Sequence, residues 1–180
     1  MAEEFKRLNR ELVYKGSIID FYKDTVLVPN GNTVHWDFIG HKGAAAVVPV
    51  LPDGRLMMVR QYRNALDRYT WEIPAGGRNG IDEPYIDCAF RELEEETGYK
   101  TEKEKLEFLL SLRTTVAFCD EKIEVYVAKD LVKTQQNLDE DEFINVKAFT
   151  MEELLEMIYS GEMEDSKTIS AILAYKAKYL

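Results

Sequence analysis

Residues 77–99 read GRNGIDEPYIDCAFRELEEETGY, a glycine-rich loop followed by a strongly acidic segment. A proline in its first turn and a glycine after its last turn predict a helix over 84–97. On a helical wheel, Glu92, Glu95 and Glu96 fall within one arc of about 100°, while the apolar side chains cluster elsewhere. The stretch therefore predicts a helix that packs with one face and presents carboxylates on another.

These carboxylates repel one another, and they crowd the helix end at which the macrodipole disfavours negative charge. A bound cation would offset both penalties. Oxygen donors without a Cys or His ligand pattern favour Mg²⁺, with Mn²⁺ as the alternative, over zinc. Arg91 lies one turn before Glu95 and can hold its carboxylate. The alternative is a solvated acidic face, which is the commoner role of a glutamate run.

The composition excludes several classes of protein. The 180 residues carry a formal charge of −10 with a pI near 4.8, which disfavours nucleic-acid binding. No apolar run approaches the length of a membrane span, and the first residues lack a signal-peptide core, so we expect a cytoplasmic protein without membrane contact. Cys88 and Cys119 have no metal-ligand spacing and are expected to be free thiols.

The rest of the sequence predicts a mixed order of strands and helices. We expect strands over 18–28, 33–39, 44–51, 56–62, 106–112, 123–128 and 143–149, the first four forming two hairpins. Thr150 and Glu153 form a capping box before a helix, and a last helix starts near Ser166. This order predicts an α+β fold, arranged as an α/β/α sandwich. We assign 1–42 to an N-terminal β extension and 43–180 to the main domain.

The spacing across the acidic helix carries a family resemblance. Gly77, five residues, Glu83, seven residues and then Arg91-Glu92-Leu93-Glu94-Glu95-Glu96-Thr97-Gly98-Tyr99 resembles the Nudix box of the Nudix hydrolases at every fixed position. The resemblance implies the Nudix fold, a mixed β-sheet flanked by helices. It also implies Mg²⁺-dependent hydrolysis of a nucleoside diphosphate linked to another group.

The resemblance also implies roles for particular residues. The metal cluster would be Glu92, Glu95 and Glu96, with Glu83 secondary and the carbonyl of Ala75 or Gly76 as an extra ligand. The catalytic residues would be Glu95, Glu92, Arg91 and, on a loop after the box, Glu121. For Glu121, a solvated turn carboxylate is the alternative.

Four further segments resemble the ADP-ribose pyrophosphatase branch of the family: Arg60-Gln61-Tyr62-Arg63, Trp71-Glu72-Ile73-Pro74-Ala75-Gly76, Asp139-Glu140-Asp141-Glu142-Phe143 and Asp165-Ser166-Lys167-Thr168. This branch implies a homodimer that exchanges N-terminal strands, with Trp36 stacking on the base of the partner's substrate. The alternative for Trp36 is a core or dimer-interface side chain. Arg63 would pair with a phosphate, and Arg60 and Glu72 would be further substrate contacts.

Two features depart from the branch. Thr115-Val116-Ala117 stands where the branch carries Ser-Pro-Gly, and Gly76-Gly77 is a doubled glycine. Other polar residues are given structural roles. His35 and His41 have no acid–base partner nearby in the sequence, Asp139 to Glu142 is expected to be a solvated turn, and Lys167 and Thr168 are expected to cap a helix.

The expected function is hydrolysis of ADP-ribose to AMP and ribose 5-phosphate. Another nucleotide sugar or dinucleotide, such as GDP-mannose or NADH, is the alternative substrate, since the altered loop can reshape the pocket. A sensor that binds a nucleotide sugar without cleaving it is the alternative from outside enzymes. We expect a small-molecule partner and no nucleic acid.

Overall fold

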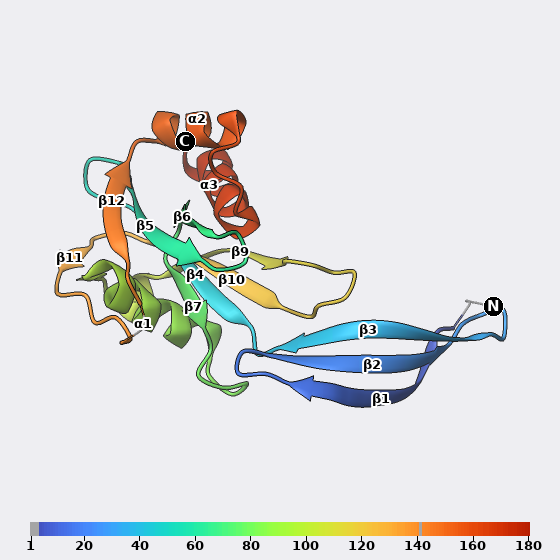
Figure 1. Ribbon diagram of the computed structural model, residues 1–180. Helices are drawn as coiled ribbons and strands as arrows, with labels where there is room; N and C mark the ends of the chain where they lie inside the picture. The colour runs from blue at the N-terminus through green and yellow to red at the C-terminus, as the bar shows by residue number, and fades with distance from the viewer. Residues whose placement is uncertain (1–3, 141) are drawn as a thin grey trace. The chain divides into compact units, whose positions relative to one another are not determined.

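The computed structural model describes residues 4–140 and 142–180, whose strands and helices are shown in Figure 1. They fall into two compact units. One contains the residues up to 43 together with 113–122, and the other contains 44–112 together with 123–180. No helix in the described ranges has the length and apolar character needed to cross a membrane.

The first unit is built on three antiparallel strands: β1 (Lys6–Lys15), β2 (Ile19–Leu27) and β3 (Thr33–His41), paired in the order β1-β2-β3. The hairpin of β2 and β3 confirms the sequence prediction of an antiparallel N-terminal extension. β1 was not predicted, because half of its side chains are charged and nearly all of them are exposed. Pairing with β2 supplies hydrogen bonds that no pattern in β1 itself announces.

The loop over 113–122 joins the first unit by accepting hydrogen bonds from the backbone N–H groups of β3. The Ile39 N–H donates to the Phe118 carbonyl at 2.7 Å, and the His41 N–H donates to the Asp120 carboxylate at 2.9 Å. Within the loop, the N–H groups of Phe118 and Cys119 donate to the Thr115 carbonyl. The loop thus closes as a turn without the proline and glycine that the family branch carries.

The remaining strands and helices are as follows: β4 (Ala44–Pro49), β5 (Leu56–Arg63), β6 (Arg68–Glu72), β7 (Ala75–Gly77), α1 (Tyr85–Thr97), β8 (Tyr99–Lys100), the 3₁₀ helix η1 (Lys103–Lys105), β9 (Glu107–Arg113), β10 (Lys122–Ala128), β11 (Val132–Lys133), β12 (Asn145–Phe149), α2 (Met151–Ser160) and α3 (Ser166–Tyr179). The strands pair in the orders β7-β4-β10-β9, β12-β5-β6 and β11-β8.

The second predicted hairpin is wrong. β4 pairs in parallel with β10 and antiparallel with β7, whereas β5 pairs with β12 and β6. A single bridge between Val50 and Leu56 is the contact that joins the two strands. The turn signal between them is real, but each strand finds its ladder partners far away in the sequence. Turn residues alone do not specify pairing.

β4 is buried along its whole length and packs on both faces. Ala44, Ala46 and Val48 belong to the larger core with α2 and α3, while Ala45 and Val47 face α1. This alternation follows from the two-residue period of a strand. Helices therefore cover both faces, as Figure 1 shows for α1 on one side and α2 with α3 on the other. The α/β/α sandwich prediction is confirmed.

Candidate functional site

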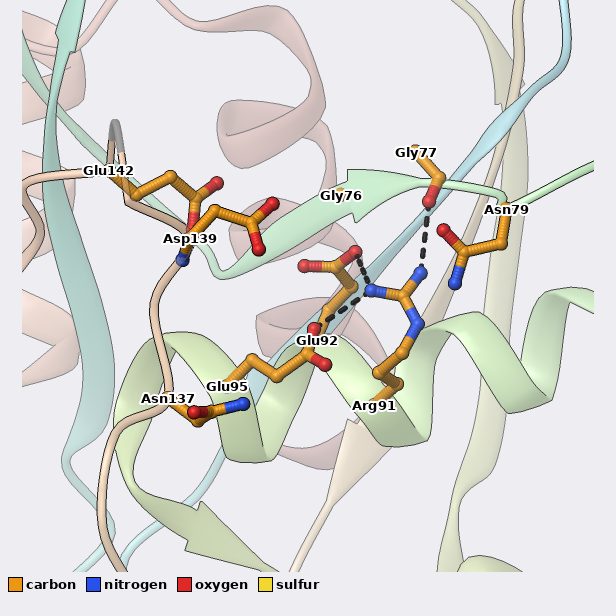
Figure 2. A pocket seen from close by; sticks show the side chains of 9 residues that line it. All are labelled: Gly76, Gly77, Asn79, Arg91, Glu92, Glu95, Asn137, Asp139 and Glu142. Atoms are coloured by element: carbon orange, nitrogen blue, oxygen red, sulfur yellow. Dashed lines mark hydrogen bonds and ion pairs between the residues drawn. The ribbon is translucent and has the colours of Figure 1, made fainter.

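The candidate site is a cavity of about 170 Å³ in the second unit, lined by three segments far apart in the sequence. Figure 2 shows its nine lining residues: Gly76, Gly77 and Asn79 from β7 and the loop after it, Arg91, Glu92 and Glu95 from α1, and Asn137, Asp139 and Glu142 from the segment before β12. The acidic face of α1 thus lines a cavity instead of facing open solvent.

β7 approaches the Glu92 side chain of α1 most closely at Gly76. A Cβ atom there would lie 2.0 Å from the Glu92 carboxylate carbon. That carboxylate is 7% exposed and is held by Arg91, so it has little room to move. Gly76 therefore gives Glu92 its place beneath the strand, which is a physical reason for a glycine at position 76.

Arg91 ties the acidic face together. Its Nη1 group donates to Glu92 at 2.6 Å and to Glu95 at 2.8 Å, and its Nη2 group donates to the Gly77 carbonyl at 3.0 Å. The Glu83 carboxylate lies 3.4 Å from Nε. Burial by itself lowers the pKa of Arg91, but the charges and hydrogen bonds of Glu92 and Glu95 outweigh it and raise the pKa. The predicted contact between Arg91 and Glu95 is present, and the same guanidinium also anchors the strand side of the cavity.

Two glutamates of α1 are almost completely buried. Burial, with repulsion from Glu95 and Glu142, raises the pKa of Glu92 to about 7 despite the attraction of Arg91. Burial and repulsion from Glu92 raise the pKa of Glu96 to about 8, although the Ala75 N–H donates to its carboxylate at 3.0 Å. The carboxylate cluster therefore carries an electrostatic penalty that a nearby positive charge would relieve.

We tested whether the residues fit a divalent cation. Across 4–140 and 142–180, no three His, Cys, Asp or Glu side chains converge as a preformed metal cluster, and Arg91 stands between Glu92 and Glu95. The donor chemistry nevertheless fits a hard cation, because the cavity is lined by carboxylate, amide and carbonyl oxygens. The space that a Cβ on Gly76 would fill is occupied by the Glu92 carboxylate. We conclude that the residues fit such an ion.

The segment 134–142 is the part of the site that sequence reasoning missed. The N–H of Asn137 donates to the Glu95 carbonyl at 3.0 Å, and the N–H of Thr134 donates to the Gly98 carbonyl at 2.7 Å. The last carbonyls of a helix lack partners within it, so they can anchor a neighbouring segment. This contact brings Asp139 and Glu142 over the acidic face. The predicted turn is present, because the Glu142 N–H donates to the Asp139 carbonyl at 3.0 Å, but both residues also line the cavity. The signal available in the sequence was the resemblance of Asp139-Glu140-Asp141-Glu142-Phe143 to the ADP-ribose pyrophosphatase branch.

Arg63 pairs with the buried carboxylate of Glu72, while its own side chain is 38% exposed. Arg63 donates through Nε at 2.7 Å and through Nη2 at 2.6 Å to the two oxygens of Glu72, which is 2% exposed. Burial by itself raises the pKa of Glu72, but Arg63 and Lys167 outweigh it and lower the pKa to about 2. We interpret Glu72 as the carboxylate that holds Arg63, with Arg63 the side chain suited to an anion.

The other predicted site residues lie in different surroundings. Trp36 is 49% exposed on β3, with its ring centroid 6.0 Å from that of Phe5, so it is not a core side chain. Arg60 lies 4.4 Å over the ring of Tyr69. The carbonyls of Gly76 and Gly77 accept weak hydrogen bonds from the Cys88 thiol. Burial is the main cause that raises the pKa of this thiol to about 12, which makes it unreactive.

Glu121 belongs to the first unit, where it has close partners. The Thr114 hydroxyl donates to its carboxylate at 2.5 Å, and His41 Nδ1 lies 3.6 Å from its other oxygen. The turn of the 113–122 loop brings Glu121 close to His41, whose Nδ1 atom also accepts the Gly43 N–H at 3.0 Å, and the structural role expected for His41 stays a prediction. Glu121 is not among the residues that line the carboxylate cavity, and its catalytic role stays a prediction.

A second cavity of about 240 Å³ lies next to the first, and Glu142 lines both. Its other lining residues are Gln61, Tyr62, Tyr69 and Phe143. The rings of Tyr62 and Tyr69 meet edge to face with centroids 5.5 Å apart. Aromatic walls with a few polar groups are typical of sites that hold part of an organic ligand.

A comparison with family models matches the NUDIX domain over residues 40–171. The chain is 40% identical over 171 residues to a methanol dehydrogenase activator of Bacillus methanolicus, covering 94% of this chain and 91% of that protein. It is 39% identical to an ADP-ribose pyrophosphatase of Bacillus subtilis with the same coverage. A crystal structure described as an ADP compounds hydrolase has a TM-score of 0.84 and covers 97% of this chain and 93% of its own, at 21% identity.

This chain belongs to the NUDIX domain family, since the family model covers well over half of it. The family prediction from the box spacing is confirmed, as are the fold class and the assignment to the Nudix pyrophosphohydrolases. Nudix hydrolases generally use divalent metal ions, which agrees with the donor chemistry of the carboxylate cavity. Both cysteines are free thiols, as predicted.

Proposed function

We propose that this protein hydrolyses the diphosphate bond of ADP-ribose, giving AMP and ribose 5-phosphate, with Mg²⁺ as its metal ion. The observation that carries the proposal is the carboxylate cavity in a chain that is 39% identical, over 94% of its length, to an ADP-ribose pyrophosphatase. A relative with the same printed activity from Mycobacterium tuberculosis is 32% identical over 98% of the chain.

Glu92, Glu95 and Glu96 would hold the metal ion, with a backbone carbonyl of Ala75 or Gly76 as a possible further donor. When bound, the ion would lower the pKa of a water molecule and stabilise charge on the phosphate oxygens. Arg91 holds Glu92 and Glu95 in place through its Nη1 group. Its charge thereby fixes two carboxylates that would otherwise repel each other.

A carboxylate must also take the proton from the attacking water. Glu142 is well placed for this step, because it lines the same cavity as Glu92 and Glu95. Glu121 is the other candidate, and it has Thr114 and His41 as partners. The second cavity, which shares Glu142, would hold one of the two groups attached to the diphosphate.

Arg63 would contact the diphosphate. Its guanidinium pairs with Glu72 through one edge and keeps further N–H groups for an anion. An acidic protein can bind a polyanion only if such local positive charges reverse the sign of the field at the site.

The test is incubation of the purified protein with ADP-ribose and Mg²⁺, followed by chromatography of the products. We expect AMP, and we expect Glu95→Gln to lower turnover by at least about 100-fold, the usual scale for a lost catalytic group. Glu94→Gln is the matched control, because Glu94 lies on the same helix but pairs with Lys100 outside the cavity. Wild-type turnover by the Glu95→Gln protein would contradict the metal role.

A panel of substrates decides between ADP-ribose and the alternatives. ADP-ribose, GDP-mannose and NADH are compared by kcat/KM under the same conditions. Absence of AMP, with efficient cleavage of another member of the panel, would transfer the proposal to that substrate. Tight binding of ADP-ribose without any product over hours would favour a sensor instead.

A second candidate function comes from the relative that is named as an activator of methanol dehydrogenase, since its identity of 40% equals that of the pyrophosphatase within one percentage point. Under this alternative the protein stimulates a dehydrogenase. Addition of the protein and its Glu95→Gln variant to a purified alcohol dehydrogenase tests this. Stimulation that survives the Glu95→Gln substitution would separate it from hydrolysis.

The proposal also includes a homodimer that forms through the N-terminal strands. It further includes a cytoplasmic location. The first unit carries large apolar side chains that are exposed, among them Phe5 before β1 and Leu8, Leu12 and Trp36 on its strands. Exposed apolar patches of this kind mark interaction surfaces. Sedimentation at micromolar concentration is expected to show a species of twice the chain mass, and a species of single chain mass would contradict the dimer.

A further inference from the structure

The start of α3 contains a buried ion network that metal binding and hydrolysis do not explain. Lys167 is 8% exposed, and its Nζ atom contacts the carboxylates of Glu72 and, at 2.9 Å, Asp165. The sequence prediction that Lys167 and Thr168 cap the helix is wrong. Asp165 is the N-cap residue, and its carboxylate accepts the Thr168 N–H at 3.0 Å. The side chains of Lys167 and Thr168 point instead to β6 and the residues after it.

Glu72 is the centre of this network. It accepts hydrogen bonds from the Nε and Nη2 atoms of Arg63, from the Thr70 hydroxyl at 2.5 Å and from Lys167. A carboxylate that is almost fully buried stays ionised only with such partners. Two positive and two negative side chains, including Asp165, make the network neutral as a whole. Neutrality matters here because an unpaired buried charge is costly.

The same segment of chain is held from two sides. On one side, the Ile73 N–H donates to the Thr168 hydroxyl at 3.0 Å, so α3 fixes the residue after Glu72. On the other side, the Ala75 N–H donates to Glu96 of α1 at 3.0 Å. The α3 contacts therefore act on the short stretch that leads directly into Gly76 and the carboxylate cavity.

Arg63 connects the network to the cavity. Its two bonds to Glu72 use the Nε and Nη2 atoms, and the Nη1 N–H groups are not part of them. Gln61 lies two residues before Arg63 on β5 and so on the same face of that strand, and it lines the second cavity, which shares Glu142 with the carboxylate cavity. Arg63 is thus a cation on the same strand face as a residue that lines the second cavity, and it is held by a carboxylate that it shares with Lys167.

We infer that Lys167 is a positioning residue for hydrolysis: it holds Glu72, and Glu72 aims Arg63 at the diphosphate of the substrate. The inference rests on the proposed function, which supplies the diphosphate. With Lys167 in place, Arg63 is not the sole counter-charge of Glu72, so its guanidinium can keep one geometry while it also binds an anion. Without Lys167, Arg63 must neutralise Glu72 alone and is drawn away from the substrate.

The test is a double-mutant cycle of Lys167→Met and Arg63→Gln, with KM and kcat measured for ADP-ribose in Mg²⁺. We expect Lys167→Met to raise KM about tenfold and to leave kcat within about twofold, because the box glutamates are untouched and a small misplacement of a binding group has effects of this order. In the Arg63→Gln background, Lys167→Met should add no further increase, since it acts through Arg63.

Lys178→Met is the matched control. It removes the same charge from the same helix, but Lys178 is exposed and pairs with Glu107 away from Glu72. It should leave KM unchanged. Lys167→Arg, which keeps the charge, should recover most of the lost affinity. Thermal unfolding of each variant identifies any that does not fold, and Lys167→Gln, which also removes the charge, replaces Lys167→Met in the cycle if Lys167→Met does not fold.

A role in folding alone would give a different pattern. If the effects of Lys167→Met and Arg63→Gln on KM multiply, or if Lys178→Met raises KM as much as Lys167→Met does, the inference is overturned. Calorimetry then gives the affinity for inorganic pyrophosphate in Mg²⁺ for the wild type and for each variant of the same cycle. These affinities test the role of Lys167 separately from the proposed function, because they do not depend on cleavage of ADP-ribose. If the wild-type protein does not cleave ADP-ribose, the proposed function fails and the pyrophosphate cycle still decides. Absence of pyrophosphate binding by the wild-type protein would also overturn the inference.

Discussion

Replacing Glu72 by glutamine removes the negative charge that Arg63 and Lys167 share in the second unit. The carboxylate is 2% exposed, so water cannot take over the role of its partners. Its pKa is lowered from 4.5 to about 2, because the attraction of the two cations outweighs the effect of burial. This difference corresponds to about 3 kcal/mol of folding free energy at pH 7, since each pKa unit is worth about 1.4 kcal/mol.

The sign of the pH dependence follows from the direction of the shift. The pKa of Glu72 is lower in the folded protein, so its stabilisation is fully present above the unfolded-state value of 4.5 and is lost as the pH falls towards 2. By linkage, about 3 kcal/mol at pH 7 becomes about 2 kcal/mol at pH 3.5. The gap between wild type and Glu72→Gln should therefore narrow by about 1 kcal/mol between these pH values.

Urea unfolding followed by circular dichroism at both pH values measures the gap, and a non-ionic denaturant avoids screening the charges. Glu107→Gln is the control, because Glu107 pairs with Lys178 at an exposed position. Its stability and pH dependence should stay close to those of the wild type. A Glu72→Gln protein within about 0.5 kcal/mol of wild type at pH 7, below the roughly 3–5 kcal/mol typical of a broken buried pair, would refute the reasoning. An unchanged gap between pH 7 and pH 3.5 would do the same.

Two other substitutions test local geometry. Gly76→Ala places a Cβ atom 2.0 Å from the carboxylate carbon of Glu92, so we expect steady-state assays to show metal-dependent turnover lowered by about 100-fold; turnover within twofold of wild type would show that Glu92 can move at no cost. Thr150→Ala removes the hydroxyl that accepts the Glu153 N–H in the capping box of α2, so urea unfolding should show a loss of about 1 kcal/mol with activity retained; an unchanged unfolding midpoint would contradict the capping role.

The sequence predicted individual helices and strands better than it predicted which strands pair with each other. The helix that carries Glu92 and Glu95, the β2–β3 hairpin and the capping box at Thr150 were all readable, because each depends on side chains close together in the chain. The pairing of β4 with β10 was not readable, since strand partners come from packing and from both faces of β4 at once. β1 escaped prediction because its charged side chains show no apolar alternation.

The residues of the candidate site also fall into those that the sequence predicted and those that it did not. Its box glutamates and Arg91 were predicted from spacing, because one helix turn brings them together. Asp139 and Glu142 were not, because their place over the cavity depends on Asn137 bonding to a carbonyl at the end of α1. A sequence shows which residues are acidic, but it does not show which helix end a distant segment will bind.

The amino-acid sequence by itself determined the family, the acidic helix and the oxygen-donor chemistry of the site, since all three follow from residue types at short, fixed spacing. The tertiary structure alone decided that Glu72 is shared by Arg63 and Lys167, which lie 104 positions apart in the chain. It also decided that Gly76 leaves room for Glu92. The physical reason is that burial and the approach of one segment to another set the energies of these groups, and both arise only when the chain is packed.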